Sequence, residues 1–205
     1  MKKLIITLTC LLMLSGVAVA SPQFDFSQGQ GALDITWRNS ENTVLGTDFS
    51  KKYNFDGSLT MGLGNNFALE YRNFVPESHS TFNTTTKVRT NEYNLLYKLD
   101  NNVAILAGIV NAKGYLSNPF VTYETNTRNF WQAGVVASTT IAPKTTLWGS
   151  VAAGNNITNY EIGVGYALSQ SWECNLNYRS LKLTHFDYDV DLEAKGFGLG
   201  LTYKY

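Results

Sequence analysis

Apolar and polar residues alternate along almost the whole chain after about Gln28. Successive side chains of a β-strand point to opposite faces, so a period of two is typical of strands with one apolar and one polar face. No stretch after Ala20 is apolar for the roughly 20 residues that a membrane helix needs. The pattern therefore predicts an all-β chain. Ten alternating runs occupy residues 33–38, 53–61, 67–72, 93–99, 103–109, 131–137, 147–153, 160–166, 172–178 and 197–205.

The first twenty residues predict a secretory signal peptide at 1–20. Lys2 and Lys3 precede an apolar core from Leu4 to Leu14, and small residues end the segment at Ala20. Signal peptidase recognises this order, so we expect cleavage before Ser21. A retained membrane anchor is the alternative, but the apolar core is short for a helix that spans a bilayer. Residues 21–205 then suffice for one domain.

Short connections alternate with longer ones between the ten runs. Residues that suit tight hairpins stand at 64–66, 100–102, 142–144 and 169–171. Longer segments lie near 39–50, 76–90, 111–128 and 181–194, with a short one near 154–158. Short turns on one side and long loops on the other are typical of outer-membrane barrels with the loops outside the cell. Ten strands would place both termini in the periplasm, and a miscount at the short outer connection would leave eight.

Aromatic residues gather at two heights on the apolar face, with aliphatic residues between them. Aromatic rings prefer the water–lipid boundary and aliphatic groups prefer hydrocarbon. A soluble β-sandwich, the alternative, has no reason to sort aromatics by height. We therefore expect a closed antiparallel transmembrane up-and-down β-barrel at 21–205, surrounded by the lipid of the bacterial outer membrane. The lower set is Phe67, Tyr97, Tyr166, Trp172, Tyr203 and Tyr205, the upper set is Trp37, Tyr53, Phe55, Tyr93, Trp131, Tyr160, Tyr178 and Phe197, and the belt is Leu33, Leu59, Leu95, Ile105, Val135, Val151, Val164, Leu176 and Leu199.

Charge and cysteine content exclude two further classes. Cleavage removes two lysines and no acids, so of 16 basic and 16 acidic residues the mature chain keeps 14 and 16, a net charge of −2. Such a chain has no basic footprint for nucleic acid, and no nucleic-acid partner is expected. Only Cys174 remains after Cys10 is removed, so no intramolecular disulfide can hold the exported chain together.

The C-terminal residues resemble the signal by which the bacterial barrel-assembly machinery recognises its clients. In that pattern a glycine is followed by two spaced aromatic or apolar residues, the last at the end of the chain, and Gly200, Tyr203 and Tyr205 match. The end is Tyr rather than the usual Phe, and Gly198 stands where a polar residue is common. The layout of the mature chain resembles small bacterial outer-membrane β-barrel proteins, including opacity-type adhesins. The resemblance implies the assembly machinery as a partner during biogenesis.

The polar face of the runs carries charges of both signs. Lone charges in a narrow interior would be costly, so their near balance predicts a paired network. A barrel of about ten strands is only slightly wider than a barrel of eight strands, whose interior is filled by side chains. We therefore expect a filled interior, with a narrow polar channel as the alternative. Inward glycines such as Gly163 would leave space, and Trp148 points inward either as a space-filling side chain or through an error in the seventh run. The acids are Asp34, Asp56, Glu70, Glu92, Glu161 and Glu173, and the bases are Arg38, Arg72, Lys98, Arg179 and Lys204.

The last loop contains a candidate metal site. Its titratable side chains stand at every second residue and would face one way in an extended chain, where carboxylates could hold Ca²⁺. The segment lacks the glycine turn and the spacing of an EF-hand loop, so a solvated projecting hairpin with Val190 and Leu192 inward is the preferred interpretation. The side chains are His185, Asp187, Asp189, Asp191 and Glu193.

Two pairs of residues were candidates for catalysis. Omptin-type proteases have ten strands and use Asp–His pairs, which His185 and Asp187 resemble, although such enzymes are longer chains. A lipid A deacylase needs a base and a serine at the lipid face, whereas His79 and Ser80 stand in a polar loop. We assign no catalytic, cofactor-binding or metal-binding residue and expect no cofactor.

The sequence therefore favours a non-enzymatic surface barrel with an envelope-structural or adhesion role through its extracellular loops. Aromatics among small polar residues suit adaptable contact surfaces for an extracellular ligand. A narrow channel for small solutes or ions is the alternative, and an outer-membrane protease or lipid-modifying enzyme is the third hypothesis. The loop aromatics that look exposed are Phe82, Tyr115, Phe120, Tyr123, Phe186 and Tyr188.

Overall fold

The computed structural model describes residues 24–79, 84–187 and 190–205. The predicted signal peptide at 1–20 lies outside these residues. The described residues contain no helix long and apolar enough to cross a bilayer. Ten main strands carry the fold: β1 (Gly31–Val44), β3 (Ser50–Gly64), β4 (Phe67–Phe74), β6 (Thr85–Lys98), β7 (Val103–Ser117), β9 (Arg128–Ala142), β10 (Thr145–Gly154), β11 (Ile157–Ala167), β12 (Trp172–Asp187) and β13 (Val190–Lys204). Three short strands extend the loops: β2 (Thr47–Asp48), β5 (Glu77–His79) and β8 (Thr122–Glu124).

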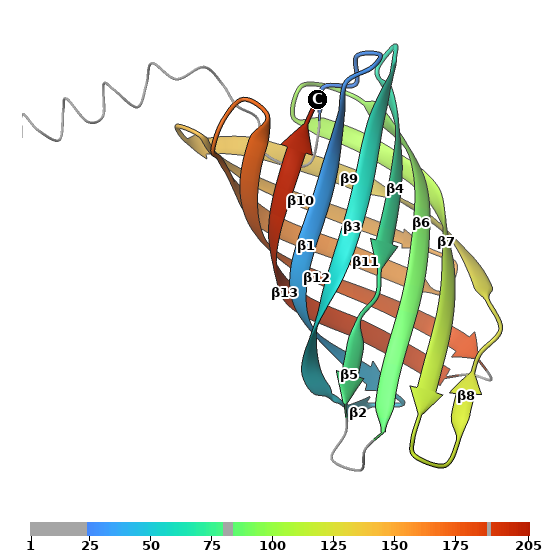
Figure 1. The fold of residues 1–205 in the computed structure, drawn as a ribbon. Helices are drawn as coiled ribbons and strands as arrows, with labels where there is room; N and C mark the ends of the chain where they lie inside the picture. Colours follow the sequence, from blue (N-terminus) through green and yellow to red (C-terminus); the bar gives the residue numbers. More distant parts are fainter. Residues whose placement is uncertain (1–23, 80–83, 188–189) are drawn as a thin grey trace, which may run out of the picture.

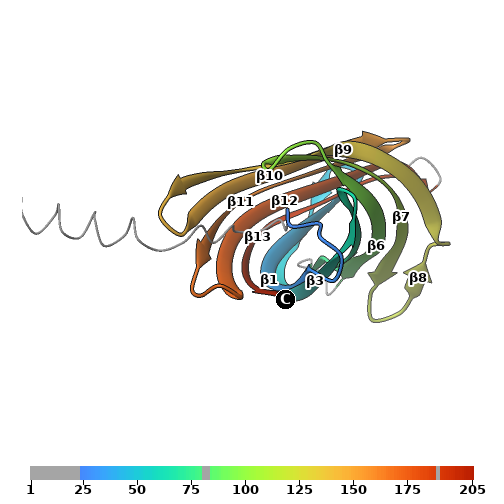
Figure 2. The same ribbon diagram turned by 90° about the horizontal axis from the view of Figure 1, so that it is seen from above.

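The ten main strands form one closed antiparallel barrel. Each pairs with its neighbours in the chain, and β1 pairs with both β3 and β13, which closes the ring. The seam ends where the backbones of Gly31 and Tyr205 exchange two hydrogen bonds of 2.9 and 3.0 Å. Figures 1 and 2 show the tilted strands around this ring. The prediction of a closed ten-stranded barrel is confirmed, and the alternative of eight strands is wrong.

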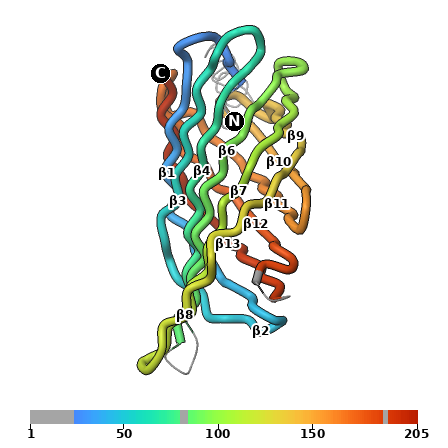
Figure 3. The backbone as a smooth tube through the Cα atoms, turned by 90° about the vertical axis from the view of Figure 1, so that its right-hand side faces the viewer, coloured from blue at the N-terminus to red at the C-terminus, as the bar shows by residue number. Residues whose placement is uncertain are grey.

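The two ends of the barrel differ. The C-terminus and the tight β3–β4, β6–β7, β9–β10 and β11–β12 turns lie at one end, whereas β2, β5 and β8 lie at the other (Figure 1). Asn65, Asn66 and Lys144 adopt the positive φ that tight hairpins require. The β7–β8 hairpin projects furthest at the second end (Figure 3). By the short-turn rule the first end is periplasmic and the second is extracellular.

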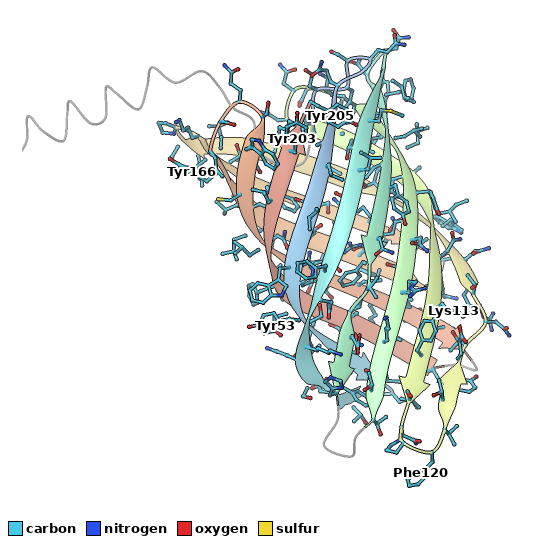
Figure 4. The ribbon with its side chains drawn as sticks, in the orientation of Figure 1. Tyr53, Lys113, Phe120, Tyr166, Tyr203 and Tyr205 are labelled. Carbon is cyan, nitrogen blue, oxygen red and sulfur yellow. The ribbon has the colours of Figure 1, made fainter. Side chains whose placement is uncertain are left out.

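The outer surface carries the two aromatic girdles and the aliphatic belt that the sequence predicts. Every residue of the belt is exposed, as are all the girdle residues except the half-buried Tyr178. Neighbouring rings pair across strands, with centroids 4.9 Å apart for Phe67 and Tyr97 and 4.5 Å apart for Trp37 and Tyr53. Figure 4 shows Tyr53 far from Tyr166, Tyr203 and Tyr205 along the barrel axis. Apolar groups thus face outward around the whole ring, as lipid requires.

Several segments predicted as long loops are strand. β6 begins at Thr85, β7 runs to Ser117, and β12 and β13 extend to Asp187 and from Val190. A strand of 15 residues such as β7, at about 3.3 Å per residue and a tilt of about 40°, rises about 38 Å, which exceeds an apolar band of about 25 Å. The barrel wall therefore continues beyond the membrane, where polar residues on the outer face hide the alternation.

Candidate functional site

A charged layer crosses the middle of the lumen. Arg38 is 2% exposed and donates from Nε to Asp56 at 2.5 Å and from Nη2 to Glu161 at 3.2 Å. Arg72 donates to the second oxygen of Glu161 at 2.7 Å, so this carboxylate joins two guanidinium groups from different strands. The predicted paired network is present. It fixes the barrel's shape because removal of any one ion would leave its partners buried and uncompensated.

A second group of ion pairs and amides completes the layer. Arg179 donates to Glu92, which is 1% exposed, and the amide of Asn159 also donates to Glu92 at 3.2 Å. Nearer the periplasm Lys204 donates to Glu173 at 2.9 Å, and Asp34 accepts from Thr202 at 2.7 Å. Of the predicted inward charges, Lys98 is half-buried close to Asp25 and stands outside the central network. The lumen is therefore polar in its centre, and each of its cations Arg38, Arg72, Arg179 and Lys204 is paired with a carboxylate.

The periplasmic end of the lumen is closed by residues before β1. Phe24 and Phe26 are 5% and 2% exposed and pack with Leu96, Leu106 and other apolar side chains inside the barrel. The segment is held by Gly64, whose backbone N–H donates to the Phe26 carbonyl at 2.9 Å. A Cβ at Gly62 would lie 2.3 Å from the Ser27 carbonyl oxygen, so only glycine admits the segment there. The alternation begins only at about Gln28, so the sequence pattern does not predict this plug.

An apolar cluster fills the lumen towards the extracellular end. Phe74 packs against the charged layer, since its ring centroid lies 4.4 Å from Cζ of Arg179. Above it, Phe130 and Phe186 stack with centroids 6.3 Å apart. The buried members are Phe74, Val88, Val110, Ala112, Phe130, Ile157, Leu181, Leu183, Phe186, Leu192 and Ala194. The expectation that Phe186 is exposed is wrong: His185 has a φ of 51° and the β12–β13 register shifts there, which turns Phe186 inward.

Little space remains between these layers. A cavity of about 50 Å³ lies beside Arg38, Trp148 and Asn177, and another of about 10 Å³ lies beside Glu92 and Gln132. The first can hold a few water molecules and the second none or one. Trp148 is 5% exposed and its ring packs where a Cβ of Gly163 would stand, 2.6 Å from Cζ2. Trp148 is thus the space-filling inward side chain, and the seventh run was assigned correctly.

A pocket of about 240 Å³ opens at the extracellular mouth, above the apolar cluster. Its floor includes Val88, Phe186 and Leu192, which are buried. Its upper wall includes Leu45, 68% exposed, and Leu116, 40% exposed. Tyr115, Tyr123, Thr86, Thr125, Val44, Lys87, Gly114 and Val190 also line it. The pocket thus combines a buried apolar floor with exposed apolar side chains around its rim.

The described residues do not assemble the candidate metal site of the last loop. His185 is exposed and its backbone N–H donates to the Asp191 carboxylate at 3.2 Å, while Glu193 lies 3.8 Å from Nζ of Lys195. Leu192 is buried and Val190 half-buried, as the hairpin interpretation predicts. The side chain of Asp187 and all of Asp189 lie outside the described residues. Within the described chain no three His, Cys, Asp or Glu side chains gather as metal ligands.

The candidate catalytic residues are likewise separate from any built site. His79 is exposed and its Nδ1 lies 2.9 Å from Oγ1 of Thr85, a partner on the neighbouring strand. Ser80 lies outside the described residues, as do Phe82 and Tyr188 of the loop aromatics. Of the others, Phe120 is 92% exposed at the tip of the β7–β8 hairpin (Figure 4), Tyr123 is exposed and Tyr115 half-buried.

Several solved structures are similar to this chain. Neisserial surface protein A aligns with a TM-score of 0.56 and 11% identity, over 87% of this chain and 100% of that chain. The attachment invasion locus protein Ail of Yersinia pestis aligns with a TM-score of 0.47 and 12% identity, over 87% and 99% of the two chains. The outer membrane protease OmpT from Escherichia coli aligns with a TM-score of 0.46 and 11% identity, over 93% and 99%. No curated protein sequence matches the chain.

Sequence identities this low carry information on the fold alone. Membership of a family is shown by a separate match to a family model. Residues 7–205 match the family described as the outer membrane protein beta-barrel domain. The match covers nearly the whole chain, and the closed ring with lipid-facing girdles has the form that such a domain requires. The chain belongs to the outer membrane protein beta-barrel family and resides in the bacterial outer membrane.

Proposed function

We propose that this protein is a non-conducting, non-enzymatic surface barrel that contacts an extracellular partner through its outer mouth. The observation that carries the proposal is a lumen filled by side chains beneath an open apolar pocket. A filled barrel is a rigid support, and the pocket is the feature of its outer end that a partner can enter. The proposed ligand is an apolar side chain or a small apolar molecule, because the described lining offers few polar groups.

The filled lumen favours this role over transport. A solute crossing the barrel would meet the Phe24–Phe26 plug, the ion pairs and the apolar cluster in series. Each layer is closed by contacts between different strands, and the cavities left are of the size of a few water molecules. Planar-bilayer recording tests this part: steady single-channel steps from the purified barrel would favour the narrow-channel alternative.

The positions of the histidines favour a non-enzymatic role. His79 ends β5, where its Nδ1 lies 2.9 Å from Oγ1 of Thr85, and His185 lies on β12, where its backbone N–H donates to the Asp191 carboxylate at 3.2 Å. A nucleophile and its base need to lie within hydrogen-bond reach. Replacing either histidine by alanine should change no lipase or protease activity of the purified protein.

Indole binding tests the mouth pocket directly, because indole is water-soluble and mimics an aromatic side chain. We expect methyl resonances of Leu116 and Leu192 to shift as indole is added to the barrel in lipid nanodiscs. Leu116→Asp places a charge in the apolar wall, which costs about 1–3 kcal/mol and should weaken binding about tenfold. Phe120→Asp makes the same charge change at the exposed tip of the same hairpin and should bind as the parent does. Equal indole binding by both variants would contradict the proposal.

A further inference from the structure

The lipid-facing wall formed by β4, β6, β7 and β9 has an ordered set of levels. At two of these levels the strand registers place four side chains directly beside one another. The lower level is mostly aromatic and consists of Tyr71, Tyr93, Ile109 and Trp131. The next level towards the extracellular end is a row of four asparagines, Asn73, Asn91, Asn111 and Asn129. All of these side chains point outward, away from the filled lumen, so the row faces the outer leaflet.

The asparagine row is tied together and to the aromatic level. Asn73 donates from Nδ2 to Oδ1 of Asn91 at 2.9 Å, and Asn111 donates to Oδ1 of Asn129 at 2.7 Å. The hydroxyl of Tyr71 also donates to Oδ1 of Asn91 at 2.9 Å. These contacts fix the amide planes, and Asn73 also donates from Nδ2 to the Thr90 carbonyl at 3.4 Å. The remaining amide groups form a preorganised polar strip just above the aromatic girdle.

Two cations lie one level above the strip. Arg89 and Lys113 are directly opposed on β6 and β7, and both lie over the ring of Tyr115, at 5.8 and 5.7 Å from its centroid. Like charges in directly opposed positions are destabilising. Lys113 is relieved by a hydrogen bond to Glu124, whereas Arg89 is exposed and forms no ion pair with the described residues. Glu124 also attracts Arg89 from beyond ion-pair distance, and an anion bound directly beside Arg89 would offset the repulsion further. Figure 4 shows Lys113 on the outside of the wall near β8.

An apolar groove of about 660 Å³ runs below the strip on the same wall. It reaches up to Asn111 and Asn129 and is lined by Leu59, Leu69, Tyr93 and Ala107, among others. The small Ala107 stands beside Leu95 and Ala133 in the register, which leaves the wall hollow between larger side chains. A groove of this kind in the hydrocarbon layer accommodates an acyl chain.

From these levels we infer that the wall binds an acylated, phosphorylated sugar lipid of the outer leaflet, of the lipid A type. Its acyl chain occupies the groove, its sugar hydroxyls and amide-linked chains meet the asparagine row, and its phosphate meets Arg89 and Lys113. The four residue steps from Tyr93 to Arg89 span about 10 Å along the membrane normal at a tilt of about 40°, which matches the depth of a lipid headgroup.

Two other cations at the extracellular end are paired with acids. Lys51 and Lys195 each lie 3.5 Å from a carboxylate oxygen of Glu41, and Lys195 is also 3.8 Å from Glu193. These lysines are already neutralised by acids on neighbouring strands. Lys51 on β3 is therefore a matched control, a cation at the same end of the barrel that is already paired with an acid.

Native mass spectrometry of the mature barrel, exchanged into detergent with added bis-phosphorylated lipid A, tests the inference. We expect a bound lipid that survives equimolar competition by phosphatidylglycerol. Arg89→Gln should weaken lipid A binding about fivefold, because one cation near a lipid headgroup contributes about this factor. Lys51→Gln should leave it unchanged.

Two comparisons distinguish a specific lipid A site from a non-specific attraction of anionic lipids to the cations of the barrel. Asn111→Leu removes an amide without changing charge, so it should weaken lipid A binding while phosphatidylglycerol binding stays as it was. Lipid A lacking both phosphates should bind the parent and Arg89→Gln equally. The inference is overturned if Arg89→Gln and Lys51→Gln weaken lipid A binding equally, or if phosphatidylglycerol displaces lipid A. Heat-modifiable gel migration verifies that each variant is folded.

Discussion

Individual residues of the central layer act as clamps between distant strands. Arg38 joins Asp56 on β3 to Glu161 on β11 and is 2% exposed. Arg38→Met would leave both carboxylates without this partner, and breaking a buried pair in this way costs about 3–5 kcal/mol. We expect urea unfolding from lipid vesicles to show a loss of that size. Lys51→Met removes an exposed cation 3.5 Å from Glu41 and should cost less than about 1 kcal/mol. Similar losses for the two variants would show that the layer does not clamp the barrel.

The alternation of side chains predicts well which residues face the lumen and which face lipid, wherever the strand is regular. It places Trp148 inward, and the absence of a side chain at Gly163 provides the room for its ring. It fails at Phe186, because a positive φ at His185 and a register shift interrupt the period of two. Neither feature has a signature in the sequence, since histidine gives no strong sign of a left-handed backbone. The partners of each inward charge were also beyond prediction, because they depend on which strands face one another across the lumen.

At the scale of elements, the depth of a residue in the membrane decides the cost of a charge. Val135 on β9 faces lipid between Ile105 and Val151, in the middle of the belt. Val135→Arg should destabilise the inserted barrel by about 2–4 kcal/mol, whereas Thr139→Arg, outward on the same strand near the periplasmic rim, should cost about 0–1 kcal/mol. Folding into vesicles followed by urea titration measures both. A Thr139→Arg loss as large as that of Val135→Arg would mean that the belt lies elsewhere on β9.

The projecting β7–β8 hairpin contains a pH-sensitive contact outside the membrane. The hydrogen bond from Lys113 lowers the pKa of Glu124 from its usual 4.5. A lowered folded-state pKa means that the contact stabilises the hairpin above pH 4.5 and that this contribution is lost as the pH falls through the lowered value. Carboxyl resonances of Glu124 should report the lowered pKa, and Lys113→Met should return it towards 4.5. An unchanged pKa in Lys113→Met would assign the shift to another group.

Elements were predictable in number and direction but not in length. Ten runs, four tight turns and the orientation follow from alternation and turn residues, since both are local. The strand ends beyond the girdles do not, because Thr-rich stretches such as 84–90 have polar residues on both faces and carry no hydrophobic period. The burial of the Phe24–Phe26 segment was also not predictable, because the segment is short and borders glycines. Its burial follows only from its position inside the closed barrel.

For the whole molecule, the three lumen layers act as seals in series, and removal of one should expose the layer behind it without opening a channel. Phe24→Ser with Phe26→Ser removes the periplasmic plug and should give the cavity beside Asn177 access to water. Asn177→Cys, introduced with Cys174→Ser to leave a single thiol, then reports this access: a small charged thiol reagent should label it only in the plug variant. The plug variant should still show no single-channel current steps in planar bilayers, because the ion pairs and the apolar cluster remain. Labelling with the plug intact would mean that the lumen is open from the periplasm, and steps from the plug variant would make Phe24 and Phe26 the sole barrier.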